Sequence, residues 1–153
     1  MRLRLLAVGR DRSGLYQPAV DEYVGRLGRY LKFELVELPE AKKHAGTPQA
    51  REEEGATILS RLDPRERVVL LDERGDQPTS VELARRMQGW LTRGQDVALV
   101  MGGSDGHSEA VRARAQETLA LSKLTLAHRL ARLVLAEQLY RAMTILRGEP
   151  YHK

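Results

Sequence analysis

The last residues of the chain carry the side chains best suited to chemistry. Residues 121–153 read LSKLTLAHRLARLVLAEQLYRAMTILRGEPYHK, an apolar turn followed by one long helix and a short tail. The tail ends in Tyr151, His152 and Lys153, which offer a ring hydroxyl, an imidazole and a cation. These groups can stack on a base, transfer a proton or hold phosphate. Chain ends usually fray, so the tail is either a disordered end or part of a site.

The long helix adds further candidate groups. Glu137 and Arg141 stand four residues apart, a spacing that permits an ion pair on one helix face. Arg141 is then available to an RNA phosphate or to the tail. His128 lies near the start of the helix, directly after the apolar turn. The four histidines, at 44, 107, 128 and 152, match no metal-ligand spacing, so no metal is expected.

Two other segments are suited to binding a small ligand. Gly102–Gly106 is a glycine loop directly after an apolar stretch, where backbone can approach a ligand closely. The turn Leu121–Leu126 offers backbone polar groups and leucine surfaces, a combination that suits an adenine ring. The Gly9–Gly14 loop has the glycine spacing of a phosphate loop, but Leu15 and Tyr16 stand where Lys and Ser or Thr belong.

The spacing of apolar residues predicts alternating strands and helices. Strands are expected at 3–8, 33–38, 67–71, 96–101 and 118–121, and helices at 15–31, 49–61, 79–91, 108–115 and 127–146. Residues 72–75 are expected to form a turn. Thr47 precedes a proline and Thr79 precedes Glu82 by three residues, two patterns that begin helices. The alternation predicts an α/β fold with a mostly parallel sheet flanked by helices.

In such sheets ligands bind beyond the carboxyl ends of the strands. Leu71-Asp72, Gly102–Gly106 and Leu121–Leu126 all follow expected strands, so we expect them to converge on one crevice. The long helix carries two apolar stripes on nearly opposite sides, whereas a surface helix of a monomer needs one. We therefore expect burial on both sides, by the sheet and by a second subunit. The stripes are residues 135, 139, 142, 143 and 146, and residues 126, 130, 133 and 134.

Length and composition limit the function classes. The 153 residues suit one domain, and no apolar run is long enough to span a membrane. The chain has no cysteine, which excludes disulfides and thiolate metal sites and favours a cytoplasmic protein. Its 25 Lys and Arg against 21 Asp and Glu give a net charge of +4, with Arg in the majority. That charge permits RNA binding but does not demonstrate it.

Three segments together resemble a known family. The strand and loop DVALVMGGSDG, the stretch LSKLTLAHRLARLVLAEQLYRA and the ending RGEPYHK are similar to the small SPOUT-superfamily methyltransferases that modify 23S ribosomal RNA. The resemblance covers essentially the whole chain, 1–153, including its LLAVGR start, and is most specific in the C-terminal third. It implies methylation at N3 of a pseudouridine in the loop of helix 69, within the assembled ribosome.

The resemblance also implies a structure and a site. It implies a C-terminal trefoil knot that forms the S-adenosylmethionine pocket, and a homodimer in which the tail of one subunit completes the active site of the other. By position, the cofactor contacts would be Leu71, Gly102, Leu121, Ser122, Lys123, Leu124, Thr125 and Leu126, with Asp72 and Gly103 as neighbours. The substrate-side or catalytic residues would be His128, Glu137, Arg141, Tyr151, His152 and Lys153, with Arg141 and Lys153 on the RNA.

Several alternatives stay open on the sequence alone. The base that removes the N3 proton can be His152, His128 or water oriented by Glu137. A non-catalytic ribosome-assembly factor that binds RNA through its arginines is a different class of function. An α/β enzyme that uses NAD is a third.

Overall fold

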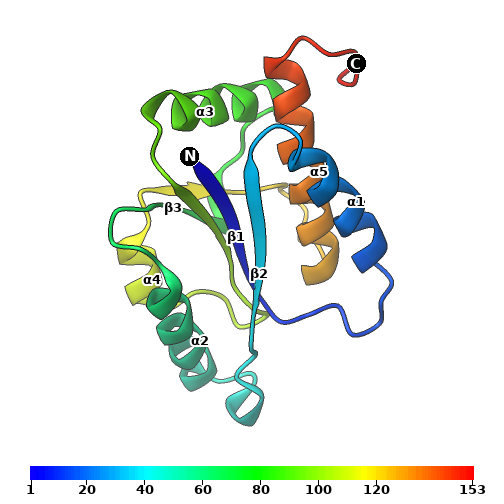
Figure 1. The fold of residues 1–153 in the computed structure, drawn as a ribbon. Coiled ribbons are helices and arrows are strands. Elements are labelled where there is room, and N and C mark those ends of the chain that lie inside the picture. The colour runs from blue at the N-terminus through cyan, green and yellow to red at the C-terminus, as the bar shows by residue number, and fades with distance from the viewer.

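The computed structural model describes residues 1–153, which form a parallel five-stranded sheet with the strand order β2-β1-β4-β3-β5 (Figure 1). The strands are β1 (Arg2–Val8), β2 (Lys32–Leu38), β3 (Arg67–Asp76), β4 (Val97–Met101) and β5 (Glu117–Leu119). Every pairing is parallel, so all five carboxyl ends point toward the same edge. The predicted α/β class and parallel sheet are confirmed.

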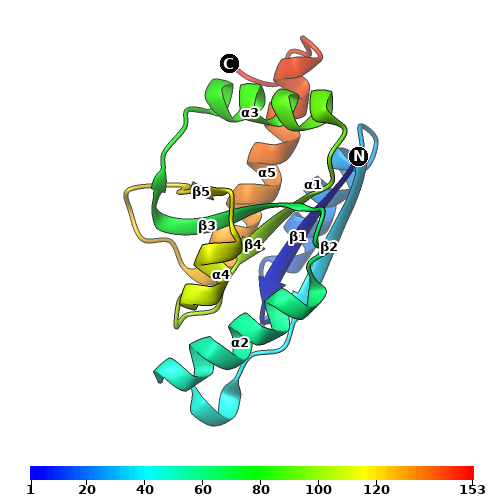
Figure 2. The same ribbon diagram turned by 90° about the vertical axis from the view of Figure 1, so that its left-hand side faces the viewer.

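Helices cover both faces of the sheet. They are α1 (Gln17–Leu27), α2 (Pro48–Arg61), α3 (Ser80–Arg93), α4 (Glu109–Arg114), α5 (His128–Leu146) and the short 3-10 helix η1 (Lys42–His44). Alternate strand residues feed two cores. One core lies under α1, α3 and α5 and contains Leu5, Leu99 and Trp90. The other lies under α2 and α4 and contains Leu6 and Val100, so the two helix groups lie on opposite sides of the sheet (Figure 2).

Most predicted boundaries agree with the structure, but the turn predicted at 72–75 is wrong. Strand β3 continues to Asp76, which pairs with Leu119 of β5 beyond an irregularity in register. The glycine that suggested a turn has another role. A Cβ on Gly75 would lie 2.7 Å from the backbone nitrogen of Leu119, so glycine allows β5 to approach β3 closely.

The first helix is shorter than the predicted 15–31. It begins at Gln17, because the Asp11 carboxylate accepts backbone N–H bonds from Tyr16 and Gln17 and holds the preceding residues as a loop. The predicted helix starts at Thr47 and Thr79 are confirmed, the second as a complete capping box with Glu82. No helix is long and apolar enough to cross a membrane. The trefoil knot stays a prediction.

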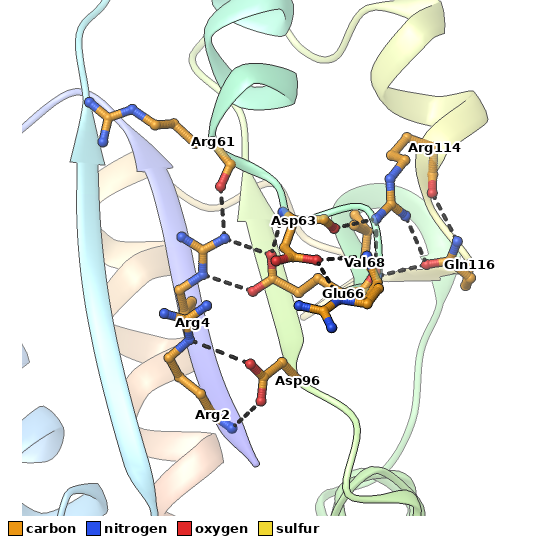
Figure 3. A network of polar contacts seen from close by, with 10 residues as sticks. Arg2, Arg4, Arg61, Asp63, Glu66, Val68, Asp96, Arg114 and Gln116 are labelled. Carbon is orange, nitrogen blue, oxygen red and sulfur yellow. Dashed lines mark hydrogen bonds and ion pairs between the residues drawn. The ribbon is translucent and has the colours of Figure 1, made fainter.

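A buried polar network joins the amino ends of the central strands (Figure 3). The Arg4 guanidinium of β1 lies 2.6 Å from the fully buried Glu66 carboxylate and donates to the Arg61 carbonyl at the end of α2. Glu66 also accepts from the Asp63 backbone, and Arg114 of α4 donates to the carbonyls of Asp63 and Glu66. The network therefore fixes the loop between α2 and β3.

Replacing Arg4 should be costly, because Glu66 would keep its charge in the protein interior without an oppositely charged partner. We expect Arg4→Ala to lower the free energy of unfolding by about 3–5 kcal/mol, the range for breaking one half of a buried pair. The matched control is Arg2→Ala, because the Arg2–Asp96 pair is much more exposed and should cost about 1 kcal/mol or less. Urea unfolding at one fixed protein concentration measures both, and equal losses would contradict the assignment.

Candidate functional site

The three segments expected to converge do so around one cavity. The main cavity has a volume of about 480 Å³ and lies at the carboxyl ends of β4 and β5 and beside residues 71–73 of β3, facing the first turn of α5. Its walls are Leu71, Asp72, Glu73, Met101, Gly102, Gly103, Ser104, Gly106, His107, Leu119, Leu121, Ser122, Leu124, Thr125, Leu126, His128 and Ala131. The size is within the range of ordinary small-molecule sites.

Almost every predicted cofactor residue lines this cavity. Leu71, Gly102 and the turn 121–126 are all in its wall except Lys123, which is exposed and lies outside the lining. The turn is held in shape by Ser122, whose hydroxyl accepts from the Leu124 backbone. Leu124 is 76% exposed although it borders the cavity, so its side chain forms an apolar rim. Leucine and methionine walls beside glycine backbone suit a flat ring with polar edges.

Sequence reasoning gave no role to His107, yet this histidine fixes the floor of the main cavity. It is buried, with a 5% exposed fraction, and its Nε2–H donates to the Leu71 carbonyl at 2.8 Å. Its Nδ1 atom is buried without a partner, and burial lowers the pKa of the ring. The histidine is therefore neutral. Its position directly after the glycine loop was the only signal in the sequence.

The glycine loop is packed too tightly for side chains. A Cβ on Gly102 would lie 2.9 Å from Cε1 of His107, and a Cβ on Gly103 would lie 2.9 Å from a carboxylate oxygen of Glu54. Glu54 is itself buried, and its desolvation raises its pKa. The loop therefore lies against two buried titratable groups, which fix its backbone beside the cavity.

Asp72 is engaged within the protein and is not free to bind a ligand through both oxygens. Its carboxylate accepts from the Arg74 backbone at 2.8 Å and from the Arg112 guanidinium at 2.7 Å. Burial alone would raise the pKa of Asp72, but these two donors outweigh it and hold the pKa below its usual range. The carboxylate thus keeps a negative charge in the cavity wall.

His128 faces the main cavity from the first turn of α5. Its Nε2 lies 3.2 Å from the Val8 carbonyl, which can only accept, so the proton is on Nε2. Burial lowers the pKa of His128, so the ring is neutral and its Nδ1 carries the lone pair. That nitrogen is the only hydrogen-bond acceptor of the neutral ring.

The tail is not frayed but folds back on the end of α5. Arg141 and the Tyr151 hydroxyl both bind one oxygen of Glu137, at 2.6 and 2.9 Å. Arg141 donates to Nδ1 of His152 at 3.2 Å, and its guanidinium lies over the Tyr151 ring. We call Glu137, Arg141, Tyr151 and His152 the tail cluster. The predicted ion pair is confirmed, and Lys153 is exposed beside this cluster.

The state of the tail cluster follows from its bonds. Burial, with hydrogen bonding to Tyr23 and Glu137, raises the pKa of Tyr151, so its hydroxyl stays protonated and acts as a donor. Because arginine can only donate, Nδ1 of His152 is the acceptor of this bond, and Nε2 of the exposed ring has no partner in the chain. The Tyr151 ring packs edge-on against Tyr140 with centroids 4.7 Å apart. The cluster is thus an ordered set of donors.

The main cavity and the tail cluster lie at opposite ends of α5. Arg141 stands thirteen positions after His128, which is about 20 Å along a helix axis. Figure 1 shows the C-terminus at the far end of α5 from the loop that enters it. Within one chain the tail cluster therefore does not reach the cavity.

The chain is similar to known proteins along its whole length. A family model described as predicted SPOUT methyltransferase matches residues 1–152. The chain is 72% identical over 153 residues to a ribosomal RNA large subunit methyltransferase H from Anaeromyxobacter dehalogenans (strain 2CP-C), with both chains fully covered. A protein of the same name from Hahella chejuensis is 44% identical over 155 residues, which cover 100% of this chain and 99% of the relative.

The buried neutral His107 should make stability depend on pH. In the unfolded chain its pKa is near 6.5, and burial lowers it in the folded protein, so the unfolded chain takes up the proton first as the pH falls. Stability is therefore lost from pH 6.5 downward, by up to about 1.4 kcal/mol per pH unit. We expect His107→Gln, which keeps a donor for Leu71, to show a shallower loss than the wild type in urea unfolding.

A second variant separates the titration from the hydrogen bond. His107→Leu removes both, so it should have the same shallow pH dependence but lose about 1–3 kcal/mol at pH 7, because the Leu71 carbonyl is left without a donor. A wild-type pH dependence in the Gln variant would mean that His107 does not titrate between the two states.

Proposed function

Because this chain belongs to the SPOUT methyltransferase family, we propose that it methylates ribosomal RNA of the large subunit, with S-adenosylmethionine as the methyl donor. The observation that carries the proposal is full-length similarity to proteins named for that activity, combined with a cavity at the carboxyl ends of β4 and β5. The target is N3 of a pseudouridine in the loop of helix 69 of 23S rRNA. The resemblance of the GGSDG loop and the PYHK ending supports this finer assignment.

The residues of the main cavity fit the methyl donor. Leucine side chains of the 121–126 turn would cover the adenine ring, and backbone of Gly102 would approach it closely. The wall contains no lysine or arginine, Asp72 is already paired with Arg112, and the exposed Glu73 has no ion pair, so the wall does not repel a cationic sulfonium. When bound, S-adenosylmethionine supplies an electrophilic methyl group. The chain must then orient the base and remove its N3 proton.

We propose that the active site is composite and forms in a homodimer. The tail cluster is about 20 Å from His128 along α5, so it completes a cavity only if that cavity belongs to a partner. The second apolar stripe of α5 supports a partner on that side: Leu130, Leu133 and Val134 are only half-buried in the single chain. Their burial would come from the second subunit.

The tail cluster would act on the RNA base as a set of donors. The exposed His152 would offer its Nε2 atom, and Arg141 and Lys153 add positive charge. These groups stabilise negative charge that develops on the base carbonyls as N3 loses its proton. The Tyr151 ring offers a stacking surface for an extruded base. For the proton itself the candidates are Nδ1 of His128, His152 after it releases Arg141, and water held by Glu137.

The substrate would be the assembled ribosome in the cytoplasm. Residues 1–153 form one five-stranded sheet with its helices, and we infer that none of these residues forms a separate RNA-binding domain. A protein of this kind depends on the ribosome to present the helix 69 loop. Free 23S rRNA is therefore expected to be a poor substrate.

Deletion of residues 151–153 tests the function and the tail together. We expect the wild type to transfer labelled methyl from S-adenosylmethionine to unmethylated ribosomes, and the deletion variant to lose at least about 100-fold in rate. Calorimetry should give both proteins the same affinity for S-adenosylmethionine, because the tail does not line the cavity of its own chain. Neither protein should bind NAD. Digestion of the product locates the methyl group.

Each other outcome has a defined meaning. Ribosome binding by the wild type without transfer would favour the non-catalytic assembly factor. Transfer that survives the deletion would contradict the role given to the tail. Methylation at a different nucleotide would leave the enzyme class intact and overturn the helix 69 assignment.

Mixing two inactive variants tests the composite site. Gly102→Val fills the wall beside His107 and leaves the tail intact, whereas the 151–153 deletion leaves the cavity intact. A mixed dimer then has one cavity and one tail that are both undamaged and belong to different chains. We expect refolded equimolar mixtures to regain about a quarter of the wild-type transfer rate, as random pairing gives. Each variant alone is the control, and no recovery would place the site within one chain.

A further inference from the structure

A second hollow lies beside the main cavity and has no role in the site described above. The basic hollow has a volume of about 270 Å³ and is lined by Gly9, Arg10, Arg12, Glu37, Leu38, Pro39, Glu40 and Lys42. It lies at the carboxyl ends of β1 and β2, on the same edge of the sheet as the main cavity. We propose that it binds a backbone phosphate of the RNA substrate next to the methylated base, an inference that rests on the proposed function.

The carboxylates of the basic hollow are already paired. Glu37 lies 2.9 Å from the guanidinium of Arg132, and Glu40 lies 2.7 Å from that of Arg129. The nearby Asp11 carboxylate is taken up by the backbone N–H groups of Tyr16 and Gln17. These anions are therefore neutralised or capped from within the protein, and they do not cancel the remaining cations.

Three cations of the hollow have no such partner. Arg10, Arg12 and Lys42 are exposed, and the structure gives none of their side chains an ion pair or a hydrogen bond. Arginine suits the forked contact with phosphate, and unpaired side chains lose no internal bond when they bind. A concave surface with free cations and compensated carboxylates is complementary to a phosphate group.

The backbone beneath these cations is held rigidly. Gly9 has φ +86° and its Cβ would lie 2.7 Å from the Arg129 guanidinium, so only glycine lets the Arg129–Glu40 pair lie across it. The Arg10 carbonyl accepts from Arg129, and the Gly9 carbonyl accepts from Arg132 at 2.8 Å. The start of the Gly9–Gly14 loop is thus fixed by α5, although it is not the phosphate loop of a nucleotide-binding protein.

The basic hollow and the main cavity adjoin each other. His128 binds the Val8 carbonyl on the cavity side, and the next residue, Gly9, lines the hollow. The first turns of α5 separate the two, with His128 facing the cavity and Arg129 facing the hollow. A base held near the cavity can therefore have a phosphate of its own strand in the hollow.

The test is the salt dependence of ribosome binding. Sedimentation binding to unmethylated ribosomes is measured over a series of KCl concentrations for the wild type and for Arg10→Ala/Arg12→Ala. We expect the double variant to bind at least about tenfold more weakly at low salt, with a log–log salt slope reduced by about one for each phosphate that the variant no longer neutralises. Its affinity for S-adenosylmethionine by calorimetry should equal that of the wild type, because neither arginine lines the cavity.

A charge-matched control is available on α3. Arg85 and Arg93 are also exposed and take part in no ion pair, so Arg85→Ala/Arg93→Ala removes the same charge from a helix distant from the hollow. The control should keep the wild-type slope. An equal loss in the control would overturn the proposal, because any exposed arginine would then serve, and an unchanged slope in the hollow variant would overturn it too.

The same experiment separates this proposal from the proposed function. Methyl transfer to ribosomes is measured in parallel for the three proteins. If the wild type and the hollow variant differ in salt slope as expected but the wild type transfers no methyl group, the phosphate site is upheld and the enzymatic function is refuted. If the hollow variant transfers methyl groups with the KM and salt dependence of the wild type, the enzymatic function is upheld and the phosphate site is refuted. Inorganic phosphate could bind to the wild type but not to the hollow variant in calorimetry, while both proteins bind ribosomes equally well. That result would assign the hollow to a free anion and overturn its assignment to RNA.

Discussion

The buried guanidinium of Arg132 fixes the first turns of α5 to the sheet, and both candidate binding regions depend on that contact. Its side chain is 2% exposed, so its charge must be satisfied inside the protein. The partners are Glu37, at the end of β2, and the Gly9 carbonyl, just after β1. These positions determine where α5 begins. His128 is thereby turned to the main cavity and Arg129 to the basic hollow, both within about one helical turn of the same anchor.

The rigidity of α5 then carries this constraint to the other end of the molecule. One side of the helix is buried by the sheet core, including Leu135, Leu139 and Met143. With its start fixed and its length set at 19 residues, the tail cluster must lie far from the cavity of its own chain. The proposed homodimer would bring a tail to the cavity of another chain without bending the helix, and it would also cover the half-buried second stripe. The geometry that separates the two regions in one chain would then let two chains share one site.

The fold could be predicted from sequence because its signals are local. Apolar spacing gave the strands and helices, and Thr47 and Thr79 gave two helix starts that the structure confirms. The rule that parallel strands end at one edge was enough to bring Leu71, Gly102 and Leu121–Leu126 together. The errors arose where a distant strand decides the conformation. Gly75 has the composition of a turn, and only the approach of β5 makes it part of a strand.

Roles that depend on hydrogen bonds or ion pairs between distant parts of the chain could not be predicted from the sequence either. His107 is one of four histidines with no distinguishing spacing, and its importance comes from the Leu71 carbonyl, 36 positions away. The basic hollow is likewise hidden in an arginine-rich composition. What distinguishes Arg10 and Arg12 is that α5 neutralises the neighbouring carboxylates and leaves these two unpaired. Ion pairs between distant residues, rather than the number of arginines, determine which charged side chains remain free to bind a partner.

The distribution of charge accounts for the arginine content more fully than net charge does. The wall of the main cavity contains two neutral histidines, Asp72, which is paired with Arg112, and Glu73, which has no ion pair. It contains no lysine or arginine, so it does not repel a cationic ligand. Cations without carboxylate partners stand outside it, among them Arg10, Arg12 and Lys42 in the basic hollow and Lys153 in the tail. A sulfonium donor and a polyanionic RNA need opposite surroundings within a short distance. Internal ion pairs achieve this separation, because they remove arginine charge where it would repel the donor and leave it where a phosphate can bind.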